Sequence, residues 1–387
     1  MSNFRFLTSG ESHGKYLNAI IEGVPSGFKI DENFINSELK RRQVGYGRGK
    51  RMQIETDTCE IKSGIRLGYT TGAPICLEIK NKDFENWQIP MSTKEVDLKN
   101  REILKLVADK SFTKVRPGHA DFAGAIKYQL EDLRDVLERS SARSTAIEVA
   151  VGAIAKQILK EFAIIGFSHV TQIGTVKAEV LPQSYTLLKE AAEHSDVRCA
   201  DDVAADMMRV EIDKAKSEGN TLGGKFEIIF GNMPVGLGSH VHWDRKLDGK
   251  IAQAVMSIPA VKSVEIGVGA EAAELLGNKM HDEVFISDGK IYRKTNNAGG
   301  IEGGMTNGEP IVVKAVMKAI PTMRKPLKTV DLYKKEQTEA HFERSDTCAV
   351  AACAVVAEAR VAWILAEAFL EKFGGDSLKE IKKNYEK

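Results

Sequence analysis

Cysteine and net charge are scarce in this sequence, and each scarcity excludes a class of protein. The cysteines are odd in number, widely spaced and never form a CxxC pair, so they predict neither a disulfide framework nor a zinc ribbon. The 55 basic residues nearly balance the 54 acidic ones, which argues against bulk binding of nucleic acid or of a membrane surface. The cysteines are Cys59, Cys76, Cys199, Cys348 and Cys353.

Long hydrophobic runs and linkers are also missing. The most apolar stretch, residues 348–370, carries Glu358, Arg360 and Glu367, so it predicts a buried helix of a soluble protein. The N-terminus has no apolar signal region, and we expect a reduced, cytoplasmic location. Because no Pro/Ser/Gly-rich or like-charge linker divides the chain, residues 1–387 are expected to form one interlocked domain.

The hydrophobic pattern is that of a mixed protein. Short β-branched runs predict strands, and longer periodic runs predict helices in both halves of the chain. This mixture favours an α+β fold with a β-α-β sandwich-like core, in which helices lie between sheets. The expected strands cover residues 19–21, 75–79, 226–230 and 311–316. The expected helices cover residues 33–42, 123–138, 142–162, 187–193, 200–218, 247–257 and 347–372.

A glycine-rich segment, residues 296–310 (NNAGGIEGGMTNGEP), has a counterpart at residues 64–75. Gly64, Gly68 and Gly72 match glycines at the same spacing in the later segment. Two further pairs run in the same order: ERS at 138–140 with ERS at 343–345, and the weaker Ser12-His13 with Ser239-His240. This self-similarity predicts two internally similar halves, about 1–220 and 221–387.

Two histidines stand beside glycine turns. His13 lies in GESHG, and His119 follows Arg116 and a Pro-Gly turn in RPGHAD. Imidazole can donate or accept a proton near neutrality, so both positions suit acid–base chemistry. Each could equally be a satisfied structural histidine. The HxH pair at 240 and 242 has no third ligand nearby, so no metal is expected.

The basic segment RRQVGYGRGKR, residues 41–51, resembles an anion clamp. Arginine side chains hold carboxylate and phosphate in bidentate fashion, which points to a small, multiply anionic substrate. An exposed basic loop and an RNA contact are the alternatives, and few aromatic residues are interleaved for stacking on bases.

The segments ERSSARSTA and ERSDTCAVA each precede a predicted helix. Their polar residues could cap that helix and leave its N-terminus available for an anion. Asp346 in the second segment suits a helix cap and a proton acceptor equally well.

Taken together, six ordered motifs closely resemble chorismate synthase over nearly the whole chain. The motifs are GESHGKYLNAIIEGVPSG, RRQVGYGRG, RPGHADFAGAIKY, ERSSARSTA, NNAGGIEGGMTNGEPI and ERSDTCAVA. The resemblance implies a lyase that eliminates phosphate in an anti-1,4 sense from 5-enolpyruvylshikimate 3-phosphate, giving chorismate. It also implies reduced FMN as cofactor, NADPH as a candidate reductant, and a homotetramer. Thr347 and Ala351 depart from the family pattern and leave the local geometry of the last motif open.

The resemblance also assigns roles to residues. It implies that His119 is the acid near the substrate phosphate. It implies that His13 protonates or orients the reduced flavin, and that Asp346 manages the proton at the flavin N5. It implies that the substrate is bound by Arg42, Arg48 and Arg116. It implies that FMN is bound by Arg139, Ser140, Ser141, Pro259, Ala260, Gly303, Lys318, Ala319, Ile320, Pro321, Thr322 and Arg344.

Two other functions use the same features. A flavin- or NADPH-dependent oxidoreductase acting on an anionic small molecule would need the same glycines and basic segment, and net oxidation of its substrate would identify it. An RNA-binding module would need the basic segment alone, and a steep loss of affinity with salt would identify it. Both account for less of the chain.

Overall fold

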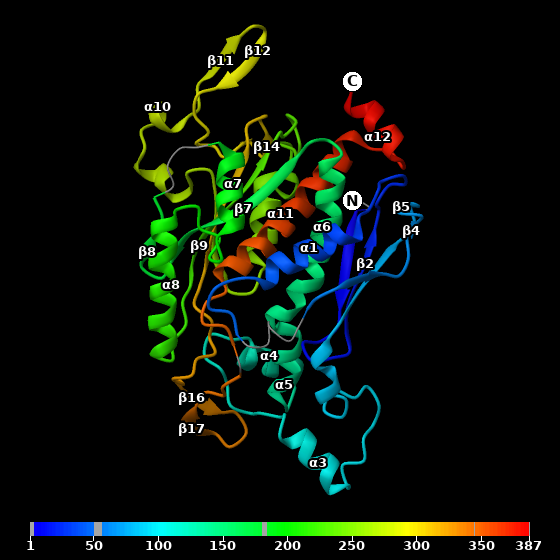
Figure 1. Ribbon diagram of the computed structural model, residues 1–387, viewed down its shortest axis with the longest axis vertical. Helices are drawn as coiled ribbons and strands as arrows, with labels where there is room; N and C mark the ends of the chain where they lie inside the picture. The colour runs from blue at the N-terminus through cyan, green and yellow to red at the C-terminus, as the bar shows by residue number, and fades with distance from the viewer. Residues whose placement is uncertain (1–3, 50–55, 180–183, 344, 387) are drawn as a thin grey trace.

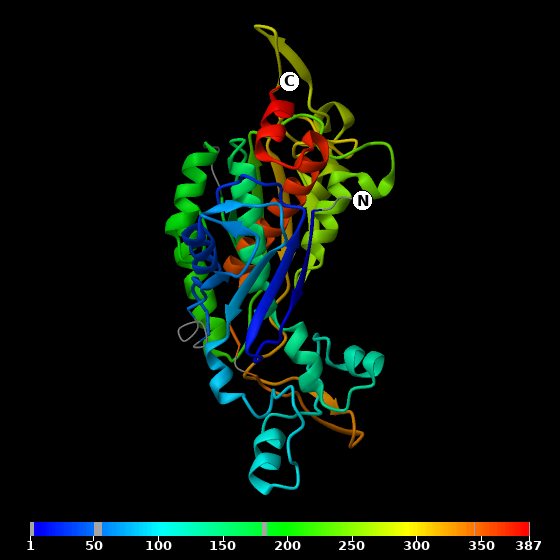
Figure 2. The same ribbon diagram turned by 90° about the vertical axis from the view of Figure 1, so that its right-hand side faces the viewer.

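Two β-sheets enclose a layer of helices in the computed structural model, which describes residues 4–49, 56–179, 184–343 and 345–386 (Figure 1). Figure 2 turns the four-stranded sheet toward the viewer, in front of the helices. This arrangement confirms the predicted α+β sandwich with helices between sheets. Both sheets bury one face on the helices, as the sandwich requires.

The two sheets have the same topology. The first has the strand order β1 (Arg5–Ser9), β2 (Tyr16–Glu22), β6 (Ile75–Lys80) and β3 (Cys59–Ile61). The second has the order β10 (Val261–Ile266), β15 (Ile311–Met317), β9 (Gly224–Gly231), β7 (Ile165–Ile173) and β8 (Val176–Lys177). Read from β7 to β10, the second sheet repeats the antiparallel pairings β1–β2, β2–β6 and β6–β3 of the first.

Helices α6 (Thr145–Lys160) and α11 (Val350–Phe373) form the centre of the middle layer. Helix α6 packs on β2 and β6, α11 packs on β7 and β9, and the two helices pack on each other. Both are apolar on nearly every side, as expected for helices covered all round. At their contact, a Cβ on Gly152 would lie 2.4 Å from the Cβ of Ala359. No helix in the described parts of the chain has the length and apolarity needed to cross a membrane.

The remaining elements flank this core. Helices α1 (Glu32–Gln43) and α9 (Leu247–Met256) complete the middle layer, against α6 and α11 respectively. The other helices are α3 (Arg101–Ala108), α4 (Asp121–Tyr128), α5 (Leu133–Ser140), α7 (Tyr185–His194), α8 (Asp202–Ser217), α10 (Gly277–Met280) and α12 (Leu378–Tyr385). The hairpins are β4 (Ile65–Arg66) with β5 (Tyr69–Thr70), β11 (Val284–Ser287) with β12 (Lys290–Arg293), β13 (Ile301–Glu302) with β14 (Met305–Thr306), and β16 (Lys328–Asp331) with β17 (Glu336–Glu339). Short 3₁₀ turns cover Lys82–Asn86, Ala142–Ser144, Trp243–Arg245 and Gly269–Glu274.

The sequence predicted the elements well, with one error. All four expected strands and six of the seven expected helices are present within a few residues of their predicted ends. The helix predicted over 123–138 is wrong, because α4 ends and α5 begins inside it. Gln129 takes the left-handed conformation (φ 53°), and Asp132 accepts a hydrogen bond from Arg134 N as the cap of α5.

The two glycine-rich segments have the same backbone path. Each forms a short hairpin, β4–β5 or β13–β14, followed by the first residue of an inner strand. The Thr70 hydroxyl donates to Pro25 O at 2.6 Å and accepts from Phe28 N at 2.9 Å. The Thr306 hydroxyl donates to Pro234 O at 2.5 Å and accepts from Leu237 N at 2.8 Å.

The position of each segment in the order of strands shows which of the sequence pairs are structurally equivalent. Ser12-His13 lie between β1 and β2, whereas Ser239-His240 follow β9, so this third pair is not equivalent and its pairing was wrong. We propose that the repeated units run from β1 to α6 and from β7 to α11. The boundary would then lie near residues 161–164 and not near 220.

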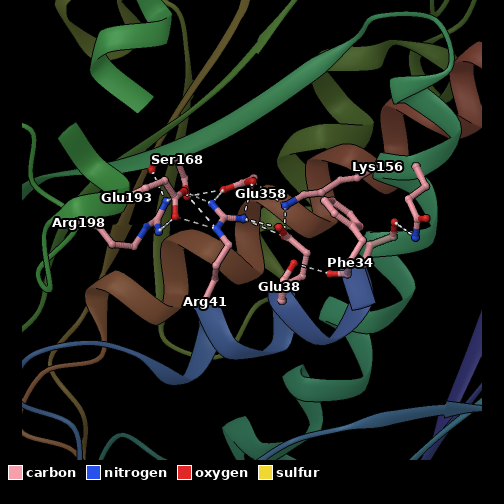
Figure 3. A network of polar contacts seen from close by, with 11 residues as sticks. Phe34, Glu38, Arg41, Lys156, Ser168, Glu193, Arg198 and Glu358 are labelled. Atoms are coloured by element: carbon pink, nitrogen blue, oxygen red, sulfur yellow. Dashed lines mark hydrogen bonds and ion pairs between the residues drawn. The ribbon is translucent and has the colours of Figure 1, made fainter. Parts of the chain in front are cut away.

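A cluster of buried ion pairs joins the helices of the middle layer to the second sheet (Figure 3). Arg41 of α1 donates to Glu38, to Glu358 of α11 at 3.0 Å, and to Glu193 of α7 at 2.5 Å. Lys156 of α6 contacts both Glu38 and Glu358. Burial raises the pKa of the Glu358 carboxyl, but Arg41 and Lys156 oppose this and hold the pKa far below its usual value. The cluster therefore holds the end of α1 in a fixed position.

Candidate active site

One end of the sandwich gathers most of the expected site residues. It lies near α4 and α5, at the end of the molecule opposite β14 (Figure 1). The turn between β1 and β2, the loop after α1, the loop before α4, the residues after β15 and those before α11 all reach it.

His13 is held from three sides. Its backbone N–H and its ring Nδ1 each lie 2.7 Å from a different oxygen of the Glu138 carboxylate, which is buried in α5. Its ring stacks on Trp87 with the centroids 3.9 Å apart. Ser12 N also donates to Glu138 O at 2.9 Å. His13 is therefore a buried ring of fixed orientation.

His119 belongs to a second histidine–carboxylate pair. Its Nδ1 lies 2.7 Å from Asp121 Oδ1, and Asp121 also accepts two hydrogen bonds of 2.8 Å from the Arg116 guanidinium. Burial raises the pKa of the Asp121 carboxyl, but Arg116 and His119 outweigh it and bring the pKa well below its usual range. Asp121 therefore stays ionised and orients both expected site residues.

Arg42 is the best candidate for contact with an anion. It is 4% exposed, its Nε donates to the Thr145 hydroxyl at 2.9 Å, and its Nη2 donates to Ala142 O at 2.9 Å. Its Nη1 lies 3.7 Å from Asp57 and makes no hydrogen bond within the described residues. Burial lowers the pKa of the Arg42 guanidinium to about 9; Asp57 opposes this, and Arg143 adds to it.

Two residues that the sequence did not indicate hold this arginine in place. Asp57 receives bonds of 2.7 and 2.8 Å from Arg143 Nη1, and Arg143 Nε donates to Asn81 Oδ1 at 2.9 Å. Asn81 in turn donates to Gly14 O at 2.7 Å, beside His13. The only sequence signal for Arg143 was its place in the ERSSARSTA motif. Asp57 had none, because its partner is 86 residues away.

Asp346 is not a helix cap. Its Oδ2 lies 2.9 Å from Arg48 Nη1, and its Oδ1 accepts from Gly49 N at 2.6 Å. Helix α11 begins four residues later, with Ala349 at its cap position and no side-chain cap bond. The helix-cap interpretation is therefore wrong; Asp346 is a carboxylate that faces the basic loop, and its role as a proton acceptor stays a prediction.

The two departures in the last motif pack against that same loop. Thr347 N donates to Gly47 O at 2.9 Å. Ala351 lies 3.7 Å from the Cβ position of Gly45. Both residues are accommodated, and the start of α11 keeps its contact with the loop after α1.

The residues expected near FMN divide into three groups. Lys318 N donates to Ala260 O at 2.9 Å, Lys318 Nζ donates to Gly118 O at 2.6 Å, and Ser345 donates to Thr322 O at 2.9 Å. Thus Pro259, Ala260 and the segment Lys318, Ala319, Ile320, Pro321 and Thr322 adjoin the His119 loop. Burial and the nearby Lys262 lower the pKa of Lys318.

The second group lies at the end of α5. Arg139 donates to Thr8 O at 3.1 Å and Gly10 O at 3.1 Å, which ties it to the β1–β2 turn. The Ser140 hydroxyl donates to Val136 O at 2.6 Å, and the Ser141 hydroxyl accepts from Arg143 N. All three side chains therefore form hydrogen bonds with backbone groups, and Ser141 lies next to Arg143.

The third group is not brought to the site. Gly303 occupies the tip of the β13–β14 hairpin, at the opposite end of the molecule (Figure 1), and nothing lies within 4 Å of its Cβ position. Arg344 lies outside the described residues.

Two hollows lie elsewhere on the molecule. The larger, of about 1150 Å³, is lined by Gly23, Pro25, Arg245, Glu367 and neighbouring residues, away from every expected site residue. The smaller lies between Ser26 and α12. Within the described ranges, no group of three or more His, Cys, Asp or Glu side chains could hold a metal ion.

Comparison with known proteins agrees with the sequence motifs. A sequence model of the chorismate synthase family matches residues 4–370. The chain is 52% identical to a chorismate synthase of Carboxydothermus hydrogenoformans over 99% of this chain and 97% of that one. It is 53% identical to one of Brevibacillus brevis over 98% and 97%. A crystal structure of a chorismate synthase superposes with a TM-score of 0.78 at 41% identity, covering 100% and 97% of the two chains.

Proposed function

Because the chain belongs to the chorismate synthase family of carbon–oxygen lyases, we propose that its polar end performs the family's reaction with reduced FMN. The family reaction removes phosphate from 5-enolpyruvylshikimate 3-phosphate in an anti-1,4 elimination and gives chorismate for aromatic biosynthesis. The family match supports this elimination over the oxidoreductase alternative.

The buried arginine cluster is the observation that carries the proposal for the substrate site. Three guanidinium groups, those of Arg42, Arg48 and Arg143, are accompanied by two carboxylates, those of Asp57 and Asp346. Among the described residues, the cluster therefore concentrates guanidinium groups at this end of the molecule. Burial of these charges costs free energy that an anion would offset. A substrate with two carboxylates and a phosphate matches this environment.

The histidines supply the proton chemistry in this proposal. His119, aligned by Asp121 and beside Arg116, donates a proton to the departing phosphate, and Arg116 stabilises its charge. His13 would hold its fixed ring toward a bound flavin. Asp346, next to Arg48, would manage the proton at the flavin N5.

The residues around Lys318 fit an FMN molecule in character. The Lys318 ammonium group donates to Gly118 O, and the Lys318 backbone N–H donates to Ala260, whose backbone takes the left-handed conformation (φ 72°). FMN, when bound in its reduced form, supplies electron density to the substrate and takes it back, so that no net oxidation occurs. Arg139, Ser140 and Ser141 would border it from α5, and Arg42 and Arg48 are candidates for contact with NADPH.

The assembly and location are part of the same proposal. Gly303 can contribute to an FMN site only if another copy of the chain supplies it, and the homotetramer that the family resemblance implies would provide such copies. We place the enzyme in the cytoplasm, with an external reductant for the flavin. Light scattering of the purified protein would test the oligomeric state.

An anaerobic assay tests the function. The protein is incubated with 5-enolpyruvylshikimate 3-phosphate and either reduced FMN, oxidised FMN, or oxidised FMN with NADPH, while chorismate and phosphate are followed together. Equal release of both products with reduced FMN is expected. Activity in the NADPH arm would add an intrinsic flavin reductase, and no release in any arm would overturn the proposal.

A further inference from the structure

The contact between Glu138 and His13 is more specific than a structural tie requires. The two residues are 125 positions apart, yet both carboxylate oxygens are used: Oε2 for the His13 backbone N–H and Oε1 for its ring Nδ1, each at 2.7 Å. The Glu138 side chain is only 2% exposed. The Glu138 backbone already holds the same turn through Ser12 N. The bond to the ring is thus an addition to an existing connection.

The geometry of this bond indicates which ring nitrogen carries a proton. Glu138 Oε2 accepts from the His13 backbone N–H, and Oε1 is placed to accept from a proton on the ring Nδ1. The Trp87 ring, stacked at an interplanar angle of 25°, opposes rotation of the imidazole. Nε2 is therefore the nitrogen directed away from Glu138.

A basic side chain also lies close to the Glu138 carboxylate. Arg134 Nη1 lies 3.6 Å from its Oε1, and the same guanidinium donates to Glu343 at 2.6 Å. Arg134 and Lys110 also lie over the Trp87 ring, at 5.1 and 4.4 Å from its centroid. Glu138 thus faces a cationic group of its own helix, and the Trp87 ring that stacks on His13 carries two cations.

We propose that Glu138 is a positioning residue that keeps a proton on His13 Nδ1, so that Nε2 is the ring nitrogen left to act on the flavin and substrate. This inference rests on the proposed function for the role of His13, but the proton on Nδ1 itself does not depend on it. Positioning residues of this kind change activity by about 10- to 10²-fold when their hydrogen bond is lost.

Glu138→Gln tests the proposal with little change in shape. A glutamine replaces one carboxylate oxygen by an NH2 group, which only donates, so its two side-chain ends cannot both accept, one from the backbone N–H and one from the ring Nδ1–H of His13. We expect ¹⁵N NMR of histidine-labelled full-length protein to show loss of the Nδ1–H signal at His13, identified by comparison with His13→Asn. The kcat of the anaerobic assay should fall about 10- to 10²-fold with KM nearly unchanged.

Two further variants separate the outcomes. Glu138→Asp keeps a carboxylate and should retain the Nδ1–H signal and part of the lost kcat, and it serves as the test if the glutamine variant does not fold. Glu161→Gln, which removes an exposed carboxylate paired with Lys382 at 3.2 Å, should change neither quantity. An unchanged Nδ1–H signal in Glu138→Gln would overturn the proposal, whatever happens to kcat. A wild type that has the Nδ1–H signal but no lyase activity would overturn the proposed function alone.

Discussion

Each of the two histidines at the polar end owes its orientation to a buried carboxylate and an arginine behind it. His13 has Glu138 and Arg134, and His119 has Asp121 and Arg116. A histidine held in this way loses little entropy when it transfers a proton, because its ring is already oriented.

Replacement of His119 should separate chemistry from cofactor binding. His119→Ala should lower kcat by at least about 10²-fold, the usual contribution of a general acid, while reduced FMN still binds. Steady-state assays and flavin titration measure the two effects. His242→Ala is a matched control, because His242 also pairs with an aspartate two positions later (2.8 Å) but is exposed. Loss of flavin binding with normal residual chemistry would contradict the role of His119.

The motifs predicted these residues singly but not their partners. His13, His119, Arg42 and Asp346 stand in recognisable local patterns. Glu138 and Asp57 act through contacts 125 and 86 positions away, and local spacing carries no information about such contacts. The orientation of each histidine therefore became visible only in the folded chain.

At the level of elements, the ion cluster of Figure 3 links helix positions to pH. Burial raises the pKa of the Glu193 carboxyl, but Arg198 and Arg41 lower it to about 2, against an ordinary value of 4.5. A carboxyl with a lowered pKa stabilises the fold fully above its unfolded pKa, and this contribution is lost as pH falls toward the folded value.

Glu193→Gln should therefore reduce the acid sensitivity of the protein. The wild type should lose free energy of unfolding between about pH 4.5 and 2, because the unfolded chain takes up the proton first. The variant should be less stable at pH 7 and lose less on acidification. Urea titrations at several pH values measure this, with Glu22→Gln, an exposed partner of Arg5, as control. Parallel curves for wild type and variant would refute the assignment.

The α6–α11 contact sets a second element-scale prediction. Gly152→Ala should destabilise the protein by about 1–3 kcal/mol, because its Cβ would lie 2.4 Å from that of Ala359. Gly249→Ala in α9, where the nearest atom is 3.9 Å away, should be neutral or stabilising. Denaturant unfolding of both variants tests the comparison. Equal changes in the free energy of unfolding for the two variants would show that the close α6–α11 contact does not determine the effect at Gly152.

Across the whole molecule, the proposed repeat of β1–α6 in β7–α11 would make Thr70 and Thr306 equivalent. Each threonine is buried and bridges a proline C=O and the N–H of the residue three positions after that proline. Thr70→Val and Thr306→Val should each cost about 1–3 kcal/mol, because a backbone N–H and C=O lose their partner. In the double variant the two costs should add, since the sites lie in different units. Unfolding titrations test this, and one near-neutral variant would show that the hairpins are not equivalent in energy.

Sequence periodicity indicated the strands of both sheets and the middle helices. The apolar runs of α6 and α11 could be buried only in a layer that is covered on both sides. It could not find the broken helix at Gln129, whose left-handed backbone has no glycine to mark it. The sequence also did not indicate that the proposed second unit begins at β7, because the strand pairing repeats there but the residues do not.

The middle layer also determines the order of events during synthesis. Helix α6 ends at residue 160, but α11, which covers it, is complete only at residue 373. At a bacterial-type rate of about 5–20 residues per second, the apolar surface of α6 waits roughly 10–40 s for its partner. The nascent chain is therefore most exposed to aggregation and to chaperones in this interval, after the first unit has left the ribosome and before the second has closed over it.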